Sequence, residues 1–151
     1  MRLDVSRSIA APAERVWEVL VDIPGSPQII SAIDSVEMLA GPDPLDVGTR
    51  WRETRTMMGK SATEEMWVTA VDPGRSYSVA ADSRGAAYES RFDVTPTGAD
   101  SCTLALHFEG HPQGTGGKVL AATVGRLFLP MERKALEKDL ADIAVAAESR
   151  A

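Results

Sequence analysis

Residues 92–110 read FDVTPTGADSCTLALHFEG, and this stretch decides the fold. Apolar side chains occupy alternate positions, at Phe92 and Val94 before PTGAD and at Leu104 and Leu106 after it. A period of two is typical of a strand with one buried face, and Pro, Gly and Asp together mark a turn. The stretch therefore predicts a β-hairpin whose apolar side chains lie on one face.

Three further turn signals precede this hairpin: MGKS at 58–61, DPGR at 72–75 and SRGA at 83–86. With PTGAD they divide 48–109 into five strands short enough to pair as an antiparallel meander. We expect the chain to reverse at Gly59–Lys60, Asp72–Arg75, Arg84–Gly85 and Thr97–Ala99. These turns pair Arg55 with Glu64, Glu53 with Met66, Trp51 with Val68, Ala70 with Tyr77, Met66 with Ala81, Val79 with Ser90 and Phe92 with Leu104.

This register places the apolar residues of all five strands on one inner face. Its larger members are Trp51, Met57, Met66, Val68, Tyr77, Val79, Tyr88, Phe92, Val94, Leu104, Leu106 and Phe108, with Ala62, Ala70, Ala81, Ser90 and Cys102 among them. The other face carries Arg50, Arg52, Glu65, Asp82, Glu89, Arg91, Asp93, His107 and Glu109. Such a division is typical of an antiparallel sheet with one solvated face.

Three charged residues, Glu53, Arg55 and Glu64, fall on the inner face. The simplest interpretation of Arg55 and Glu64 is a cross-strand ion pair at the rim of the sheet. Glu53 lies deeper, and a buried carboxylate without a partner costs several kcal/mol. It must therefore reach Arg55, water or a ligand, and we expect Glu53 and Arg55 to form the polar end of a pocket.

The flanking segments supply helices and two more strands. Arg2–Ile9 alternates as a strand, and Pro12 suits the first position of a short helix. The segment Pro24–Ile33 predicts a turn or a second short helix, and Asp34–Leu39 a strand.

The C-terminal segment predicts a long amphipathic helix that Thr115 can cap. Its apolar positions are Leu120, Val124, Leu127, Phe128, Met131, Leu136, Leu140 and Ile143. Pro130 removes one backbone hydrogen bond, so we expect a kink there. This helix is the candidate cover for the inner face of the sheet.

Four segments carry a resemblance to a known superfamily: SIAAPAERVWEVLVDI at 8–23, VGTRWRETR at 47–55, VTAVDPGRSYSV at 68–79 and residues 92–110. The chain resembles the SRPBCC superfamily, which has the helix-grip fold of START-like and polyketide cyclase/dehydrase-like proteins, over about residues 2–148. The resemblance implies an α+β fold in a single domain, residues 1–151: a curved antiparallel sheet of about seven strands wrapped around the C-terminal helix. It also implies a cavity that takes an apolar or aromatic small molecule, but neither an activity nor catalytic residues.

Composition and charge exclude several classes of protein. A chain of 151 residues is long enough for one folded core, and no apolar run is long enough to span a bilayer. The net charge of −6 opposes nucleic-acid binding, which needs a basic face. A single Cys102 and the lack of a secretory signal favour a cytoplasmic protein without internal disulfides.

We expect neither a cofactor nor a metal ion. His107, Glu109 and His111 alternate along one strand, which spreads their side chains too far apart to converge on a metal. The segment GHPQGTGGKV at 110–119 lacks the first glycine and the hydroxyl residue of a phosphate-binding loop.

Small residues at the middle of the inner face, Ala81 and Ser90, leave volume that larger side chains would fill. The terminal helix can close this gap, but we favour a cavity of ligand size. The candidate ligand-binding residues are Trp51, Glu53, Arg55, Met66, Tyr77, Ala81, Tyr88, Ser90, Leu106, Val124 and Phe128.

Three functions remain open. The preferred one is binding or carriage of a hydrophobic or aromatic small molecule, such as a lipid, polyketide or quinone. The alternative is a polyketide cyclase or dehydratase-type enzyme, in which Glu53 is the general acid or base and a tyrosine or Arg55 polarises a carbonyl. The third is a module that binds a protein partner or forms a homo-oligomer. The sequence leaves open whether the protein is an enzyme.

Overall fold

The computed structural model describes residues 2–57, 59–83, 86–112 and 114–150, and it places their side chains except at 83, 86, 112 and 114–131. The elements follow in the order β1 (Arg2–Ile9), α1 (Ala13–Val21), α2 (Ser26–Ile29), β2 (Ile33–Ala40), β3 (Arg50–Met57), β4 (Lys60–Asp72), β5 (Ser76–Ser83), β6 (Ala86–Gly98), β7 (Ser101–Pro112) and α3 (Gly114–Ser149).

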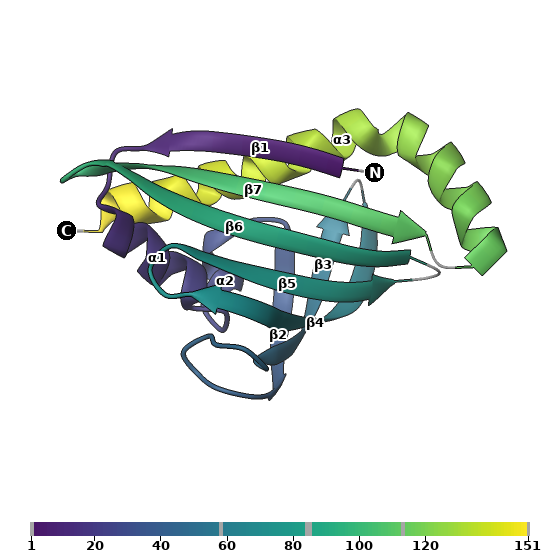
Figure 1. Ribbon diagram of the computed structural model, residues 1–151, viewed down its shortest axis with the longest axis horizontal. Coiled ribbons are helices and arrows are strands. Elements are labelled where there is room, and N and C mark those ends of the chain that lie inside the picture. The colour runs from purple at the N-terminus through teal and green to yellow at the C-terminus, as the bar shows by residue number, and fades with distance from the viewer. Residues whose placement is uncertain (1, 58, 84–85, 113, 151) are drawn as a thin grey trace.

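Within the described residues, seven antiparallel strands form one sheet in the order β1-β7-β6-β5-β4-β3-β2. Figure 1 shows this sheet curving past α3, with α1 beside the C-terminal end of that helix. The predicted α+β helix-grip architecture is therefore confirmed. Two boundaries differ from the prediction. Pro12 is the N-cap of α1 rather than its first helical residue, a difference of one residue, and α3 begins at Gly114, two residues before a helix capped by Thr115 would begin. The kink predicted at Pro130 falls outside the described side chains.

Two of the predicted strand registers are wrong by two residues. Between β3 and β4, Trp51 pairs with Met66 and Glu53 with Glu64, because the chain reverses between Met57 and Lys60, one residue earlier than expected. Arg55 accordingly lies opposite Ala62 rather than Glu64. Side chains alternate with a period of two, so a slip of two residues leaves every side chain on its predicted face.

Between β6 and β7 the second slip has a similar cause. Phe92 pairs with Leu106 rather than Leu104, because Gly98 pairs with Ser101 across a tight turn and the register shifts after Pro96. The turn is shorter than the predicted three-residue loop and lies further along the chain. The apolar residues of both strands nevertheless keep the inner face.

Between β4 and β5 a bulge places one residue on the face opposite to the predicted one. The predicted pairs Met66–Ala81 and Val68–Val79 are present, but the register shifts between Val68 and Ala70. Val71 therefore lies opposite Tyr77, and Ala70 is exposed instead of facing inward. An extra residue in one strand turns the following side chains to the opposite face. The β5–β6 register agrees with the prediction.

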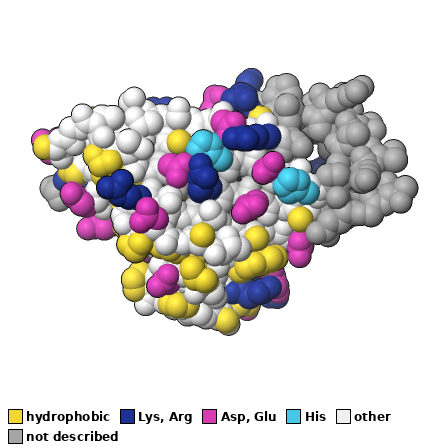
Figure 2. Space-filling view, in the orientation of Figure 1, with side chains coloured by type: hydrophobic (Ala, Val, Ile, Leu, Met, Phe, Trp, Pro, Cys, Tyr) yellow, Lys and Arg dark blue, Asp and Glu magenta, His cyan; other side chains and the backbone are white. Residues whose placement is uncertain are grey.

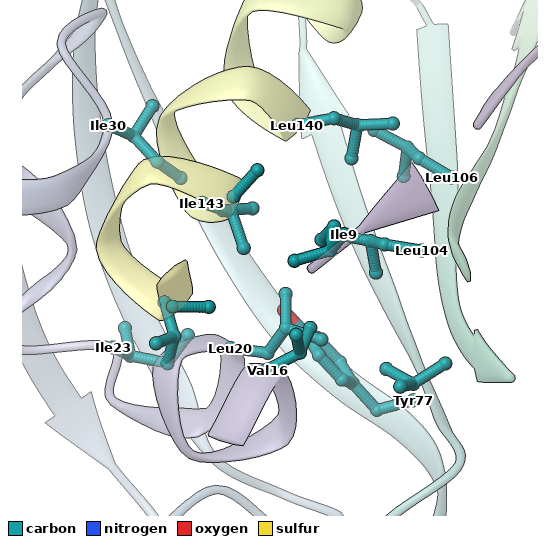
Figure 3. Close-up of a cluster of buried hydrophobic side chains, with 14 of the residues drawn as sticks. Ile9, Val16, Leu20, Ile23, Ile30, Tyr77, Leu104, Leu106, Leu140 and Ile143 are labelled. Atoms are coloured by element: carbon teal, nitrogen blue, oxygen red, sulfur yellow. The ribbon is translucent and has the colours of Figure 1, made fainter. Parts of the chain in front are cut away.

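The core fills the end of the molecule where α1 and the C-terminal half of α3 meet the sheet (Figure 3). Val16 and Leu20 on α1 and Leu140 and Ile143 on α3 all belong to this cluster, and all four are buried. Other members are Ile9, Ile23, Ile30, Tyr77, Leu104 and Leu106. Leu20, Ile23 and Ile143 in this cluster also border an open volume between the sheet and the helices.

Candidate functional site: a cavity under the sheet

A cavity of about 600 Å³ lies between the inner face of the sheet and the helices. The apolar side chains of its wall are Val19, Leu20, Ile23, Ile29, Ile30, Ile33, Trp51, Met57, Ala62, Met66, Val79, Phe92, Leu106, Phe108, Ala135, Leu136 and Ile143. Ser90, one of the two small residues at which the sequence predicts missing volume, lies in this wall.

Eight of the eleven predicted ligand-binding residues line this cavity: Trp51, Glu53, Arg55, Met66, Tyr77, Tyr88, Ser90 and Leu106. Ala81 is buried on β5 but lies outside the wall. It sits between Met66 and Tyr88 on the neighbouring strands, and its methyl group is too short to reach past these larger side chains. The side chains of Val124 and Phe128 lie outside the described residues. Contact of any of these residues with a ligand stays a prediction.

Aromatic rings form two stacked pairs on the wall. Tyr77 and Phe92 lie with ring centroids 5.2 Å apart, and Tyr88 and Phe108 with centroids 5.5 Å apart. Burial, and then the charge of Glu53, raises the pKa of Tyr77, so its phenol stays protonated at neutral pH. The wall therefore combines flat apolar surfaces with neutral hydroxyl groups.

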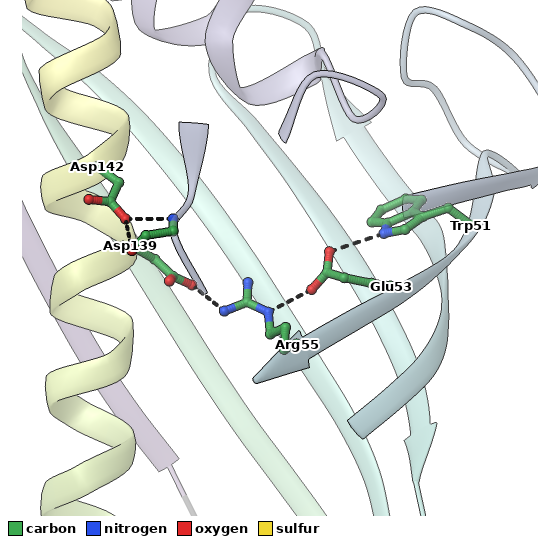
Figure 4. Close-up of polar contacts among 6 residues, drawn as sticks. Trp51, Glu53, Arg55, Asp139 and Asp142 are labelled. Atoms are coloured by element: carbon green, nitrogen blue, oxygen red, sulfur yellow. Dashed lines mark hydrogen bonds and ion pairs between the residues drawn. The ribbon is translucent and has the colours of Figure 1, made fainter. Parts of the chain in front are cut away.

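The polar end of the cavity centres on Glu53, which is only 8% exposed. Its Oε1 accepts a hydrogen bond from Trp51 Nε1 at 3.3 Å, and its Oε2 accepts one from Arg55 Nε at 2.7 Å (Figure 4). The two donors satisfy the buried carboxylate, as a charged group in a low-dielectric site requires.

Arg55 also contacts a residue that the sequence analysis missed. Its Nη1 donates to Asp139 Oδ2 at 2.8 Å, so the guanidinium joins β3 to α3 (Figure 4). The predicted Arg55–Glu64 ion pair is therefore wrong, because Arg55 faces Ala62 across the strands and turns toward two other carboxylates. Although burial opposes its charge, Asp139 and Glu53 raise the pKa of Arg55, which stays protonated. We call these three residues the Glu53–Arg55–Asp139 cluster.

Asp139 is 3% exposed, and its Oδ1 has no hydrogen-bond partner among the described residues. Burial raises the pKa of its carboxyl group, and Arg55 only partly offsets that effect. A signal for this residue was present in the sequence. Leu136, Leu140 and Ile143 mark the apolar stripe of the helix, and an acidic residue at 139 falls within it.

Two more carboxyl groups line the same cavity. Glu132 lies on α3 and is partly buried, and burial together with the nearby charge of Glu64 raises its pKa. Glu64 lies on β4 opposite Glu53. Lys60 and His111 also belong to the wall, and both are exposed.

The outer face of the sheet is polar, and Figure 2 shows charged side chains and histidines gathered over it. There His107 Nδ1 lies 2.7 Å from Asp4 Oδ1, and His107 Nε2 lies 2.9 Å from Asp93 Oδ2. Among the described residues, no group of three or more His, Cys, Asp or Glu side chains is placed to hold a metal ion. No helix in the described part of the chain is long and apolar enough to cross a membrane.

The curved sheet, the terminal helix and the cavity between them define a START-like helix-grip protein. The family model for polyketide cyclase/dehydrase and lipid transport proteins matches residues 1–148, and the chain belongs to this family. No curated protein matches the chain in sequence.

Solved structures share the fold at low sequence identity. The Zhui aromatase/cyclase from Streptomyces sp. R1128 is 19% identical with a TM-score of 0.85, covering 99% of this chain and 94% of its own. A truncated norcoclaurine synthase from Thalictrum flavum is 21% identical with a TM-score of 0.74, and the match covers 100% of this chain and 95% of that protein's chain. A START superfamily protein from Mycobacterium smegmatis is 21% identical with a TM-score of 0.69, and the match covers 99% of this chain and 95% of that protein's chain. At these identities the likeness concerns the fold alone.

Proposed function

We propose that the protein binds or carries a hydrophobic or aromatic small molecule in the cavity under the sheet. The observation that carries the proposal is the wall itself: about 600 Å³ enclosed mainly by apolar and aromatic side chains, with polar groups gathered around the Glu53–Arg55–Asp139 cluster. Ligand pockets of proteins have this size and this combination of an apolar lining with few oriented polar groups. Among the described residues the exposed large hydrophobic side chains are Met38, Val47 and Val145, which offer little apolar surface for binding a protein partner.

A cyclase or dehydratase-type enzyme is the second candidate, and the Glu53–Arg55–Asp139 cluster favours it. Arg55 can stabilise developing negative charge on a carbonyl oxygen, and a carboxyl group beside it can move a proton. Both oxygens of Glu53 already accept hydrogen bonds, whereas Asp139 Oδ1 accepts none from the described residues. Asp139 therefore joins Glu53 as a candidate acid–base residue. A cytoplasmic location is part of the proposal as well.

Native mass spectrometry of the purified protein tests carriage. We expect a mass above that of the denatured chain, in agreement with a bound molecule, and loss of this surplus in Ser90→Phe. Ser90 lines the cavity, so a phenyl ring there occupies ligand volume. Thr95→Phe is the matched control, because Thr95 is exposed further along β6.

Two outcomes contradict carriage: equal native and denatured masses, or a surplus that Ser90→Phe retains. The enzyme candidate makes a separate prediction, namely turnover of a polyketide-like substrate that Glu53→Gln or Asp139→Asn abolishes while the far-UV circular dichroism stays unchanged. A carrier keeps its affinity for an uncharged ligand in Glu53→Gln, because the binding energy of such a ligand comes mainly from apolar contact.

A further inference from the structure

The polar end of the cavity carries more negative than positive charge. In the Glu53–Arg55–Asp139 cluster two carboxylates share one guanidinium, with N–O distances of 2.7 Å and 2.8 Å. When both carboxyl groups are ionised, two negative charges and one positive charge leave an excess of one negative charge in a buried site, and burial opposes this state by raising the pKa of Asp139. An excess charge out of water is unfavourable unless a partner of opposite sign neutralises it.

The rest of the described wall supplies no buried basic group to offset this excess. Glu132 on α3 lies in the same lining, and besides Arg55 the basic side chains of the described wall are Lys60 and His111. Both basic side chains are exposed, and His111 Nε2 lies 3.6 Å from Glu109 Oε2. Solvent screens charges at the surface more strongly than charges inside a cavity, so the interior field is negative.

Asp139 supplies an independent observation. Its carboxyl group is buried in the cavity wall, and its Oδ1 has no hydrogen-bond partner among the described residues. Buried polar atoms almost always have a partner, so an unpaired one calls for an explanation, and a bound water, an ion or a ligand group can each supply the missing hydrogen bond. The terminal torsion of an Asp side chain is broad, so a small rotation presents either oxygen to the cavity.

We propose that the ligand of this cavity is a protonated amine on an apolar or aromatic body, with its ammonium group at Asp139. The inference rests on the proposed binding function and names the chemical class of the ligand. One ammonium group cancels the excess charge of the cluster and donates an N–H to the carboxylate of Asp139. The stacked rings of Tyr77 and Phe92, and of Tyr88 and Phe108, form the wall for the aromatic body.

Three probes of nearly equal shape and different charge test the inference: naphthylmethylamine, naphthylmethanol and naphthoate. Isothermal titration calorimetry near neutral pH compares their affinities for the full chain. We expect the amine to bind at least about tenfold more tightly than the alcohol, because a charge-assisted hydrogen bond is about twice as strong as a neutral one. We expect naphthoate to bind most weakly, since it adds a negative charge to the site.

Asp139→Asn locates the effect. This variant keeps the shape of the side chain and removes its charge, so the amine should lose its advantage while the affinity for the alcohol stays within about threefold. Glu137→Gln is the control, because Glu137 is an exposed carboxylate on the same helix. It changes the net charge of the protein equally and should leave the preference for the amine unchanged.

The outcomes separate this inference from the proposed function. Tighter binding of the alcohol or of naphthoate overturns the inference and leaves the binding function standing. An amine preference that Asp139→Asn retains, or that Glu137→Gln abolishes equally, also overturns it. Absence of binding by all three probes, together with equal native and denatured masses, overturns the binding function and the inference with it. If Asp139→Asn does not fold, the order of the three affinities in the wild-type protein decides.

Discussion

At the scale of single residues, Arg55 is the side chain on which the polar end of the cavity depends. It donates hydrogen bonds to Glu53 on its own strand and to Asp139 on α3. A buried ion pair contributes little net stability, since desolvation offsets most of the attraction. Removal of one partner is different, because it leaves the remaining charges buried without compensation.

We therefore expect Arg55→Met to lower the free energy of unfolding by about 3 kcal/mol at neutral pH. Chemical denaturation with urea measures the change. Arg52→Met is the control on the outer face of the same strand, where Arg52 contacts Glu37 and Glu65 and all three side chains are more than one-third exposed. Arg52→Met should lower the free energy of unfolding by no more than about 1 kcal/mol. Equal losses at the two positions would contradict the conclusion that the charges around Arg55 are buried.

The pH dependence of stability distinguishes two carboxyl groups one helical turn apart. Burial raises the pKa of Asp139 above its ordinary value of 3.8, so the native state binds this proton more tightly than the unfolded state. The contribution of Asp139 to the free energy of unfolding therefore declines as the pH rises from the ordinary pKa to the raised one. Asp142 behaves in the opposite way, because hydrogen bonds from Lys138 and Ser31 outweigh its burial and lower its pKa.

We expect the free energy of unfolding of Asp139→Asn to rise relative to that of wild type as the pH is raised from about 4 to about 7. The free energy of unfolding of Asp142→Asn, relative to wild type, should fall as the pH rises through the ordinary aspartate pKa of 3.8, because the contribution of Asp142 is present above that pH and lost below it. Thermal unfolding of both variants from about pH 3 to about pH 7 measures the two slopes. Slopes of the same sign would show that the two environments do not differ as described.

At the scale of elements, the described part of α3 holds the sheet through its last turns. Leu140 and Ile143 are buried, and Ala144 and Ala147 are small enough for the helix to approach its neighbours closely. Arg15 Nη1 on α1 donates to the carbonyl of Ala147 at 3.5 Å, and Ser31 donates to Asp142 from the segment before β2. The C-terminal half of the helix is thus fixed on several sides.

Leu140→Ala should cost about 3 kcal/mol, because it removes a side chain that is 1% exposed and leaves a cavity in the core. Val145→Ala is the matched control, since Val145 is 66% exposed on the same helix. Its effect should lie within about 0.5 kcal/mol. Thermal or urea unfolding compares the two variants, and a cost for Val145→Ala as large as that for Leu140→Ala would place the buried face of α3 elsewhere.

At the scale of the whole molecule, one continuous sheet joins every strand of the described chain, and its first and last strands in sequence, β1 and β7, are neighbours. The N-terminal strand therefore completes the sheet next to the strand that leads into α3. Because both ends of the chain contribute to one core, we propose that residues 1–151 form a single domain.

A single domain predicts one cooperative unfolding transition. Far-UV circular dichroism reports the sheet and helices, and tryptophan fluorescence reports Trp17 on α1, Trp51 in the cavity wall and Trp67 on β4. The two midpoints should coincide within experimental error. A molecule that binds the cavity should raise the common midpoint, whereas two separate transitions would contradict the single domain.

The sequence by itself determined the faces of the strands and hence the fold class. Alternation with a period of two assigned Trp51, Val79 and Leu106 to the buried side, and it did so in spite of two register slips of two residues. A slip of two conserves the face, so the pattern tolerates errors in turn position. The same pattern placed Glu53 and Arg55 together at the cavity.

Only the tertiary structure decided the partners across elements. Asp139 lies 84 residues from Arg55 in sequence, and nothing in either local pattern specifies their contact. The bulge after Val68 and the exclusion of Ala81 from the cavity wall likewise depend on how neighbouring strands and side chains pack. Local periodicity determines which face of an element is buried, whereas the charge balance of a site depends on residues that meet only after the chain folds.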